Sequence, residues 1–323
     1  MSATIFAQED ALEPALAALA RGEVMAIPTE TVYGLAGDAT NGTAIARIFA
    51  AKRRPRFNPL IAHVADMEMA ERLVVFDDVS RQLATRFWPG PLTLVLPLRA
   101  DAGVHPLVTA GLETLAVRMP RGFAHELIAA FGKPLAAPSA NSSGRISATT
   151  AAHVADDLGS RIPLVVDGGP TPVGLESTIL KVERGGLYLL RPGGLSAEAI
   201  TSATGLPLIR DGSHGIQAPG MMASHYAPHA AMRLDATSVL PGEAWLGFGP
   251  EPAPAGAVAS LNLSPGGDLV EAAANLFAYM QSLDRSGAAA IAVAPIPRTG
   301  LGEAINDRLA RAAAPRDDAF PPD

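Results

Sequence analysis

The segment VMAIPTETVYGL, residues 24–35, joins a short apolar run to a dense cluster of polar side chains. Residues 24–27 have the length and character of a buried strand, and Pro28 ends the run. The preceding residues, 8–21, carry Ala and Leu at helical spacing, and Gly22 stops that pattern. A helix that passes into a buried strand in this way is typical of an α/β fold.

Helical and strand patterns alternate along the first two thirds of the chain. Further strands are predicted at residues 60–64, 92–96, 115–117, 135–137 and 164–166, and further helices at residues 41–54, 79–87, 123–131 and 150–157. Some strand segments follow one another without an intervening helix, which favours a twisted mixed sheet flanked by helices. Residues 178–190 are predicted to form a hairpin with Gly185 and Gly186 at its turn.

The texture of the sequence changes after Pro207. Residues 210–230 contain Gly, Pro, His and Ser without periodicity, which indicates a long linker. Strand and helix patterns then alternate again, at residues 244–248, 268–283, 288–294 and 302–313. A chain of 323 residues suits two domains. We therefore predict a large α/β domain at residues 1–208, an interdomain linker at 209–230 and a small Rossmann-like α/β domain at 231–323.

Composition narrows the class of protein. The formal net charge of -7 argues against a protein that coats nucleic acid electrostatically. The absence of cysteine excludes disulfides, thiolate zinc sites and cysteine nucleophiles. No apolar stretch reaches the roughly 18 residues of a membrane span, and the acidic N-terminal segment is unlike a signal peptide. We expect a soluble, cytoplasmic protein with no membrane contact.

Four cations occupy five positions in the segment KRRPRF, residues 52–57. At the C-terminal end of a helix these side chains could simply be solvated and favoured by the helix dipole. They could instead form a phosphate clamp, in which lysine supplies a point charge and arginine a bidentate fork. The composition of this segment alone leaves both interpretations open.

A second polar cluster, APSANSSG at residues 137–144, lies between a predicted strand and a predicted helix. Its hydroxyls, amide and backbone N–H groups could bind an anion, or they could form an Asx or Ser turn that caps the helix. Arg118, Ser177, Thr178 and Arg191 form a more scattered polar set at predicted strand ends. The spacing of His225 and His229 suits a metal, but Pro228 disfavours a shared helix there. No Walker-type phosphate loop is present.

Taken together, these segments resemble the threonylcarbamoyl-AMP synthase family, also called YrdC-like, in its long two-domain form. The matching motifs are PTETVYGL at 28–35, Lys-x-Arg at 52–54, NPLIAHV at 58–64, Ser-x-Asn at 139–141, LEST at 175–178, RPG at 191–193, PGMMASHYAP at 219–228 and GLGEAINDRLARAA at 300–313. They cover nearly the whole chain in the family's order. The chain departs from the family at Met222-Ala223-Ser224, where relatives usually carry a basic residue before His-Tyr.

The resemblance implies a role for each matching position. Lys52 and Arg54 belong to the cationic motif that the family needs for activity. The positions that fall where the family holds threonine are Thr31, His63, Arg118, Ser139 and Ser177. The positions that fall where it holds ATP are Arg54, Asn58, Thr114, Asn141, Thr149, Arg191 and Tyr226.

The implied reaction converts L-threonine, bicarbonate and ATP into threonylcarbamoyl-AMP and pyrophosphate, for threonylcarbamoyl modification of the adenosine next to the anticodon in tRNA. The implied reaction requires no protein nucleophile. Because the sequence shows no cluster of carboxylates that could bind Mg²⁺, the ion would be bound mainly by the phosphate oxygens of ATP. The product would pass to a tRNA threonylcarbamoyltransferase complex; direct tRNA contact and oligomeric state are left open. Because carbamates and mixed anhydrides decompose in water, we hypothesise that residues 210–230 cover the site through Tyr226.

Two other functions are compatible with parts of the sequence. A non-catalytic RNA-binding module would bind RNA in a salt-dependent way, but the acidic net charge argues against it. An enzyme that transfers carbamoyl from carbamoyl phosphate is the second alternative, since related domains do so within larger maturation factors. Those factors carry zinc-finger-like parts, which a chain without cysteine cannot form.

Overall fold

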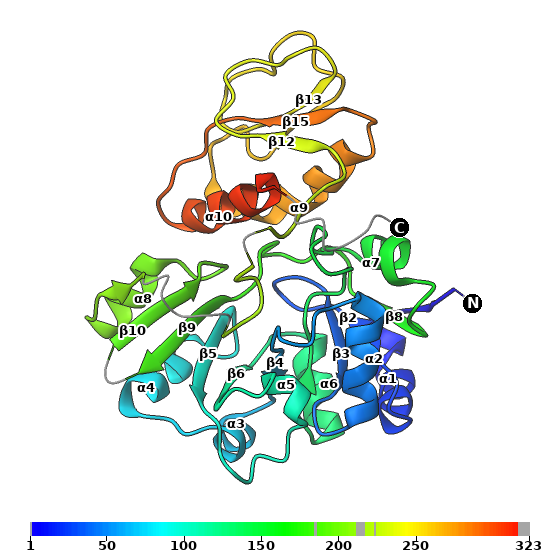
Figure 1. The fold of residues 1–323 in the computed structure, drawn as a ribbon, viewed down its shortest axis with the longest axis vertical. Coiled ribbons are helices and arrows are strands. Elements are labelled where there is room, and N and C mark those ends of the chain that lie inside the picture. Colours follow the sequence, from blue (N-terminus) through cyan, green and yellow to red (C-terminus); the bar gives the residue numbers. More distant parts are fainter. Residues whose placement is uncertain (1, 184–185, 211–216, 223, 316–323) are drawn as a thin grey trace. The chain divides into compact units, whose positions relative to one another are not determined.

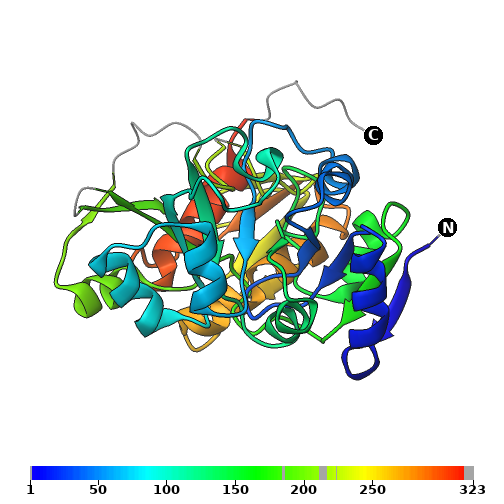
Figure 2. The ribbon, with the colours of Figure 1, turned by 90° about the horizontal axis from the view of Figure 1, so that it is seen from below.

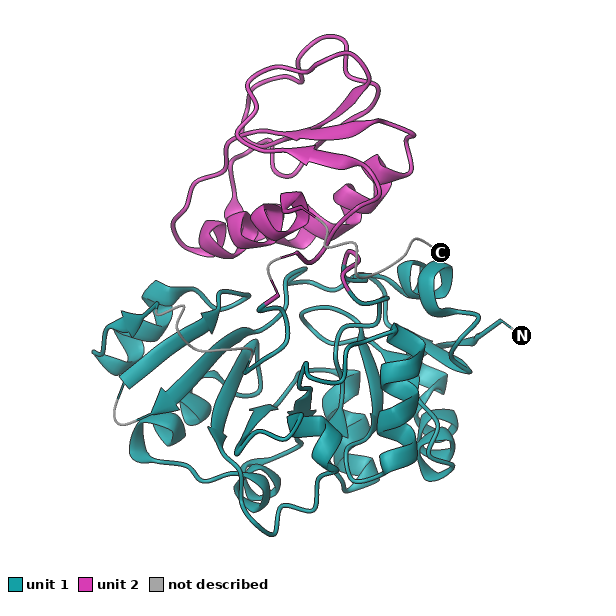
Figure 3. Cartoon of the chain, in the orientation of Figure 1, with its two compact units in different colours: residues 1–143, 147–221 teal, residues 144–146, 222–323 magenta. Residues whose placement is uncertain are grey.

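The computed structural model describes residues 2–183, 186–210, 217–222 and 224–315. The chain forms two compact units, coloured separately in Figure 3: residues 1–143 with 147–221, and residues 144–146 with 222–323. Within the described ranges, no helix combines the length and the apolar character needed to cross a membrane.

A mixed sheet forms the centre of the first unit (Figure 1). Its eleven strands, in the part of the chain that is described, have the order β1-β8-β2-β3-β7-β4-β6-β5-β9-β10-β11. They are β1 (Thr4–Ala7), β2 (Met25–Ile27), β3 (Gly34–Asp38), β4 (Ile61–His63), β5 (Leu92–Pro97), β6 (Thr114–Arg118), β7 (Leu135–Ala136), β8 (Leu164–Asp167), β9 (Thr178–Glu183), β10 (Gly186–Arg191) and β11 (Leu208–Ile209). Strand β4 runs parallel to β6, whereas β5 runs antiparallel to it, so the predicted mixed sheet is confirmed.

Helices pack on this sheet and bury its apolar residues. They are η1 (Gln8–Asp10), α1 (Leu12–Ala20), α2 (Gly42–Lys52), α3 (Met67–Leu73), α4 (Asp78–Phe87), α5 (Pro106–Thr109), α6 (Phe123–Phe131), α7 (Ala151–Leu158) and α8 (Ala197–Thr204). Figures 1 and 2 both show α1 and α2 toward one end of the sheet and α4 and α8 toward the other. Core side chains such as Ile45, Ile48 and Leu94 are fully buried, and each such side chain stabilises the fold by about 1.5–3 kcal/mol.

The ends of α2 determine where the cationic segment lies. Asn41 caps the helix by accepting hydrogen bonds from the backbone N–H groups of Thr43 and Ala44. The helix ends at Lys52, two residues before the predicted end, because Arg53 adopts a left-handed conformation with φ of 51°. The chain therefore turns sharply between Lys52 and Arg54, and both of those side chains are buried.

The first unit also contains the helix predicted at residues 8–21 and the hairpin predicted at residues 178–190. The helix predicted at residues 8–21 is interrupted at Ala11, which separates η1 from α1. The hairpin predicted at residues 178–190 is confirmed, since β9 and β10 pair antiparallel. Of its predicted turn residues, Gly185 lies outside the described residues and Gly186 begins β10.

The second unit is a small α/β structure, as predicted. Its parallel strands have the order β12-β15-β13-β14, and two helices pack together on one face of this sheet (Figure 1). The elements are β12 (Ala231–Arg233), β13 (Glu243–Gly247), β14 (Ser260–Asn262), α9 (Leu269–Asp284), β15 (Ala290–Val293) and α10 (Leu301–Ala313). Strand β14, helix α9, strand β15 and helix α10 follow one another and account for the alternating patterns near the end of the sequence.

Candidate active site

Lys52 joins two motifs that are far apart in the sequence. Its side chain is 1% exposed, and Nζ donates hydrogen bonds of 2.5 Å to the main-chain carbonyls of Ser139 and of Asn141. Burial, together with the nearby positive charge of Arg54, holds the pKa of Lys52 well below its usual value. The structure therefore places the Lys-x-Arg and Ser-x-Asn motifs in direct contact, and the interpretation of Lys52 as a solvated helix end is wrong.

Arg54 is oriented by the motif that follows it. Its Nη2 donates to Asn58 Oδ1 at 2.6 Å and to the carbonyl of Pro59 at 2.8 Å, and its Nε donates to the carbonyl of Asn58 at 3.1 Å. Arg54 is 7% exposed and Asn58 is fully buried. The predicted ATP ligand Asn58 thus fixes the guanidinium of Arg54.

A network behind the Ser-x-Asn loop fixes its position. Asp157 accepts hydrogen bonds from both the backbone N–H and the hydroxyl of Ser142. Arg161 donates to Asp157 Oδ1 at 2.8 Å, to Ser142 Oγ at 2.7 Å and to the carbonyl of Ala51 at 2.7 Å. These bonds tie the loop to the end of α2, beside Lys52. Asp157 and Arg161 were not among the predicted site residues, although their spacing of four residues is that of an ion pair along a helix.

His63 and Arg118 end neighbouring strands, β4 and β6. His63 Nδ1 lies 3.3 Å from the carbonyl of Ile61, which can only accept, so Nδ1 carries the hydrogen and Nε2 is left with a lone pair. Burial, and then the charge of Arg118, lower the pKa of His63 to about 3. His63 is therefore neutral at physiological pH and presents an acceptor.

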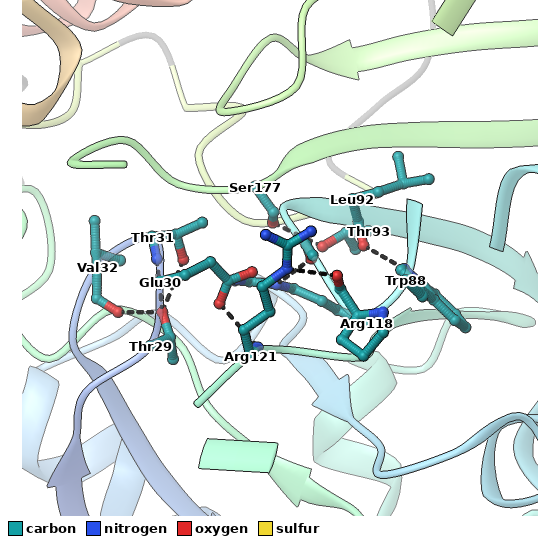
Figure 4. A network of polar contacts seen from close by, with 12 residues as sticks. Thr29, Glu30, Thr31, Val32, Trp88, Leu92, Thr93, Arg118, Arg121 and Ser177 are labelled. Atoms are coloured by element: carbon teal, nitrogen blue, oxygen red, sulfur yellow. Dashed lines mark hydrogen bonds and ion pairs between the residues drawn. The ribbon is translucent and has the colours of Figure 1, made fainter. Parts of the chain in front are cut away.

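Glu30, a residue that sequence analysis quoted but gave no role, lies beside Arg118 (Figure 4). Glu30 Oε1 is 2.8 Å from Arg118 Nη2, and both side chains are almost completely buried. Arg118 Nε donates to the carbonyl of Gly90 at 3.2 Å, and Glu30 Oε2 accepts from the backbone N–H of Arg121 at 3.1 Å. Arg118, one of the predicted threonine positions, thus has a carboxylate neighbour of its own.

Thr31 and Ser177 supply buried hydroxyls to the same region (Figure 4). Thr31 Oγ1 is 2.9 Å from Thr29 Oγ1, whose own hydrogen is directed at the carbonyl of Val32 at 2.6 Å. Ser177 Oγ is 2.7 Å from Thr93 Oγ1 on β5. Both predicted threonine ligands are therefore held by a neighbouring threonine rather than being exposed to solvent.

Arg191 lies against the LEST motif. Its Nη2 and Nε donate to the carbonyl of Ser177, at 2.8 and 3.2 Å, and its Nη1 donates to the carbonyl of Pro219 at 3.1 Å. Gly193 follows in the RPG motif, and a Cβ atom there would lie 2.3–2.5 Å from the backbone of residues 176–178. Only glycine allows these two motifs to pack so closely.

The remaining predicted residues, Thr114, Thr149 and Tyr226, make other contacts. Thr114 begins β6, at the opposite end of that strand from Arg118. Thr149 Oγ1 is 3.4 Å from His153 Nδ1, and its carbonyl accepts from the backbone N–H of Thr171. Tyr226 belongs to the second unit, where its ring stacks on Phe277 at 5.5 Å and lies 5.0 Å from the guanidinium carbon of Arg308.

Neither a metal cluster nor a surface hollow beside α2 adds residues to this set. In the described ranges, no group of three or more His, Asp or Glu side chains is arranged to hold a metal ion. A hollow of about 470 Å³ lined by Glu23, Arg47, Arg161 and apolar neighbours lies along α2 and includes none of the predicted site residues. The arrangement is one of buried cations, hydroxyls and a neutral imidazole, which suits the binding of anions and of a small polar molecule.

Comparison with known proteins tests this interpretation. Residues 17–193 match the Sua5–YciO–YrdC family model, described as "Telomere recombination", and residues 195–314 match the model for the C-terminal domain of threonylcarbamoyl-AMP synthase. A threonylcarbamoyl-AMP synthase of Bacillus subtilis is 41% identical over 322 residues, which cover 94% of this chain and 92% of that protein. The chain belongs to the threonylcarbamoyl-AMP synthase family. The resemblance inferred from the sequence motifs is thereby confirmed.

Solved structures of the threonylcarbamoyl-AMP synthase family share both units. The crystal structure of Pyrococcus abyssi Sua5 complexed with L-threonine has a TM-score of 0.85 at 36% identity, and the alignment covers 96% of this chain and 97% of that one. A variant of the same protein, in which an adjacent histidine and tyrosine are replaced by alanine, has a TM-score of 0.86 at 34% identity and 96% coverage of both chains. In this member of the family a His-Tyr pair occurs once, at His225–Tyr226.

Proposed function

We propose that this chain condenses L-threonine, bicarbonate and ATP into threonylcarbamoyl-AMP with release of pyrophosphate, acting as a nucleotidyltransferase. The observation that carries the proposal is the contact of Lys52 with the carbonyls of Ser139 and Asn141. It brings a buried cation, a second cation at Arg54 and a hydroxyl- and amide-bearing loop to one place, as the binding of a triphosphate requires. Family membership supplies the identity of the reaction.

In the proposed reaction the carbamate of threonine attacks the α-phosphorus of ATP, and pyrophosphate leaves. Negative charge builds on the phosphoryl oxygens, so positioning and electrostatic stabilisation supply the catalysis. Lys52, Arg54 and Arg191 would neutralise the triphosphate, with Asn58, Thr114, Asn141, Thr149 and Tyr226 completing the ATP site. ATP would arrive as its Mg²⁺ complex, with the ion held mainly by phosphate oxygens.

The threonine subsite would be built around Arg118. Its guanidinium suits the threonine carboxylate, and the lone pair on Nε2 of neutral His63 suits the threonine hydroxyl, which must donate to it. Thr31, Ser139 and Ser177 would add further polar contacts. Valine would leave the His63 acceptor unpaired, so it should be rejected strongly. Serine differs by a methyl group worth roughly 1–3 kcal/mol and should be the more effective competitor.

The proposed domains are a catalytic domain at residues 1–208 and a C-terminal domain at residues 231–323. The linker that joins them, residues 209–230, would act as a lid over the site. A structure of a relative was solved with an adjacent histidine and tyrosine replaced by alanine, and this supports a role for His225 and Tyr226 in the proposed lid. We further propose that the reaction takes place in the cytoplasm, and that the product is passed to a threonylcarbamoyltransferase complex that modifies tRNA. A protein lacking residues 210–323 should bind ATP more weakly or turn over more slowly; full activity would exclude the lid.

The decisive experiment measures pyrophosphate release from MgATP and bicarbonate with threonine, serine, valine or no amino acid. We expect release that depends on threonine and is lost in folded Lys52→Ala and Arg118→Ala variants. Release that ignores the amino acid, or no release, would contradict the proposal. Carbamoyl phosphate and salt-dependent RNA binding would then be tested in turn.

A further inference from the structure

The proposed threonine subsite leaves one buried carboxylate without a role, that of Glu30. Its side chain is 8% exposed, and Oε1 is 2.8 Å from Nη2 of Arg118. Neither of these two atoms makes a hydrogen bond to any residue that the structure describes. The contact is therefore an ion pair in which the N–H groups of the guanidinium are not aimed at the carboxylate.

Buried charges in proteins are normally both paired and hydrogen-bonded. Of the five N–H groups of Arg118, only that on Nε donates to a described residue, the carbonyl of Gly90. The other carboxylate oxygen, Oε2, accepts from the backbone N–H of Arg121 and so fixes the orientation of Glu30. The pair is held in place while a donor and an acceptor, one on each partner, are left for a molecule that brings both complementary groups.

A zwitterionic α-amino acid brings these two groups on one carbon atom. Its carboxylate matches the N–H groups of Arg118, and its ammonium matches Oε1 of Glu30. Among the described residues with printed interactions, the pair meets Arg121 through its backbone N–H and acts on His63, which is neutral at physiological pH. Glu30 is thus the anionic group of this described cluster, next to the guanidinium where the proposed function puts threonine.

We propose that Glu30 receives the α-ammonium group of threonine and accepts the proton that this group must lose before the carbamate forms. The inference rests on the proposed function. It adds a substrate-contacting proton acceptor to a set of residues that otherwise bind and orient.

The Glu30 carboxylate takes one proton from the ammonium, which frees the nitrogen lone pair to bond to the carbon of bicarbonate. As the N–C bond forms, the bond from that carbon to the bicarbonate hydroxyl breaks, and the hydroxyl leaves as water with the second proton of the amine. The carbamate keeps the third proton on nitrogen and one negative charge, and Glu30 returns its proton to solvent.

The test compares the full-length protein with its Glu30→Gln variant in threonine-dependent pyrophosphate release across a range of pH. Positioned acid–base groups contribute about 10²- to 10⁴-fold, so we expect kcat of the variant to fall by about 100-fold at neutral pH. Without an acceptor, the variant would use only threonine that is already deprotonated. Its deficit should therefore shrink about tenfold per pH unit as pH rises toward the pKa of the amine, which is about 8 or above.

A residue that only held Arg118 in place would behave differently. Glu30→Gln would then raise KM for threonine while kcat kept the wild-type pH profile, and that result would overturn the inference, as would an unchanged kcat. If the wild-type protein shows no threonine-dependent release at all, the proposed function fails, which is a distinguishable outcome.

Asp38→Asn is the matched control. Asp38 is also a buried carboxylate, 4% exposed, but it ends β3 and is paired with Lys133 at 3.3 Å and with Thr40. This variant should keep the wild-type pH profile. Should Glu30→Gln fail to fold, Glu30→Asp decides, because it keeps the charge but withdraws it by one methylene. We expect its kcat to fall by about tenfold or more, and an unchanged kcat would overturn the inference.

Discussion

His63 and Arg118 occupy paired positions at the ends of the adjacent parallel strands β4 and β6. Their placement explains why the imidazole stays neutral: it is buried, and a protonated ring would lie beside a guanidinium. The pair thus places a cation, which suits carboxylates, beside an uncharged acceptor, which suits hydroxyls.

The neutrality of His63 should make the protein sensitive to acid. Its pKa is about 3 in the folded chain and near 6.5 when unfolded, so below pH 6.5 the unfolded chain binds a proton that the folded chain does not. The stabilising contribution is fully present above pH 6.5 and falls by about 1.4 kcal/mol per pH unit as pH drops toward 3. The free energy of unfolding can be measured in urea at pH 7 and at pH 4.5. Between these two pH values, we expect it to fall by about 3 kcal/mol less in the His63→Gln variant than in the wild type. Equal losses would show that His63 is not the acid-sensitive group.

Replacing Lys52 with methionine should separate activity from stability. The burial of the Lys52 amine costs free energy that methionine does not, which offsets the loss of the bonds to Ser139 and Asn141. We expect a folded protein, with stability within about 2 kcal/mol of the wild type, whose kcat for pyrophosphate release is lower by roughly 100-fold or more. Thermal melts and the release assay test this together. If the variant has the melting temperature and the kcat of the wild type, Lys52 has no role in the reaction.

Arg54 and Asn58 should act as one unit. Asn58→Ala removes the 2.6 Å hydrogen bond to Arg54 Nη2, and bonds to charged groups are worth about 1.5–3 kcal/mol. We therefore expect KM for ATP to rise roughly 10- to 100-fold. In a double-mutant cycle, adding Asn58→Ala to Arg54→Ala should have little further effect. Additive effects would mean that Asn58 meets ATP independently of Arg54.

Gly193 should tolerate no side chain. A Cβ atom there would overlap the backbone at Glu176, Ser177 and Thr178, none of which is a flexible side-chain end. We expect Gly193→Ala to lower the free energy of unfolding by about 1–3 kcal/mol and to raise KM for threonine, since Ser177 must move. Gly266→Ala is the control, because its Cβ would meet no atom within 4 Å. Equal stability of the two variants would contradict the packing argument.

The sequence predicted the α/β class and most long elements, because their apolar patterns extend over many residues. It missed β1 at the edge of the large sheet, β3 and the short helices α3 and α5. It also missed β11, β12 and β14, which have two or three residues and are too short to show a period. For the site, the resemblance of local motifs to the family pointed to Lys52, Arg54 and Asn141. The motifs could not show that Lys52 binds the carbonyls of the other motif, or that Glu30 faces Arg118, because those contacts depend on how the strands assemble.

The two hydrogen bonds of Lys52 span 87 and 89 residues of chain. Contacts of such length form only after the intervening chain has been made and its loop closed, which costs conformational entropy. The β1–β8 pairing and the contact of Arg191 with Ser177 require still later residues to have been made. We therefore expect a nascent chain on the ribosome to have no ATP-splitting activity until nearly the whole first unit has emerged. Incomplete chains would then be inactive, and they would not consume ATP to make a product that decomposes in water.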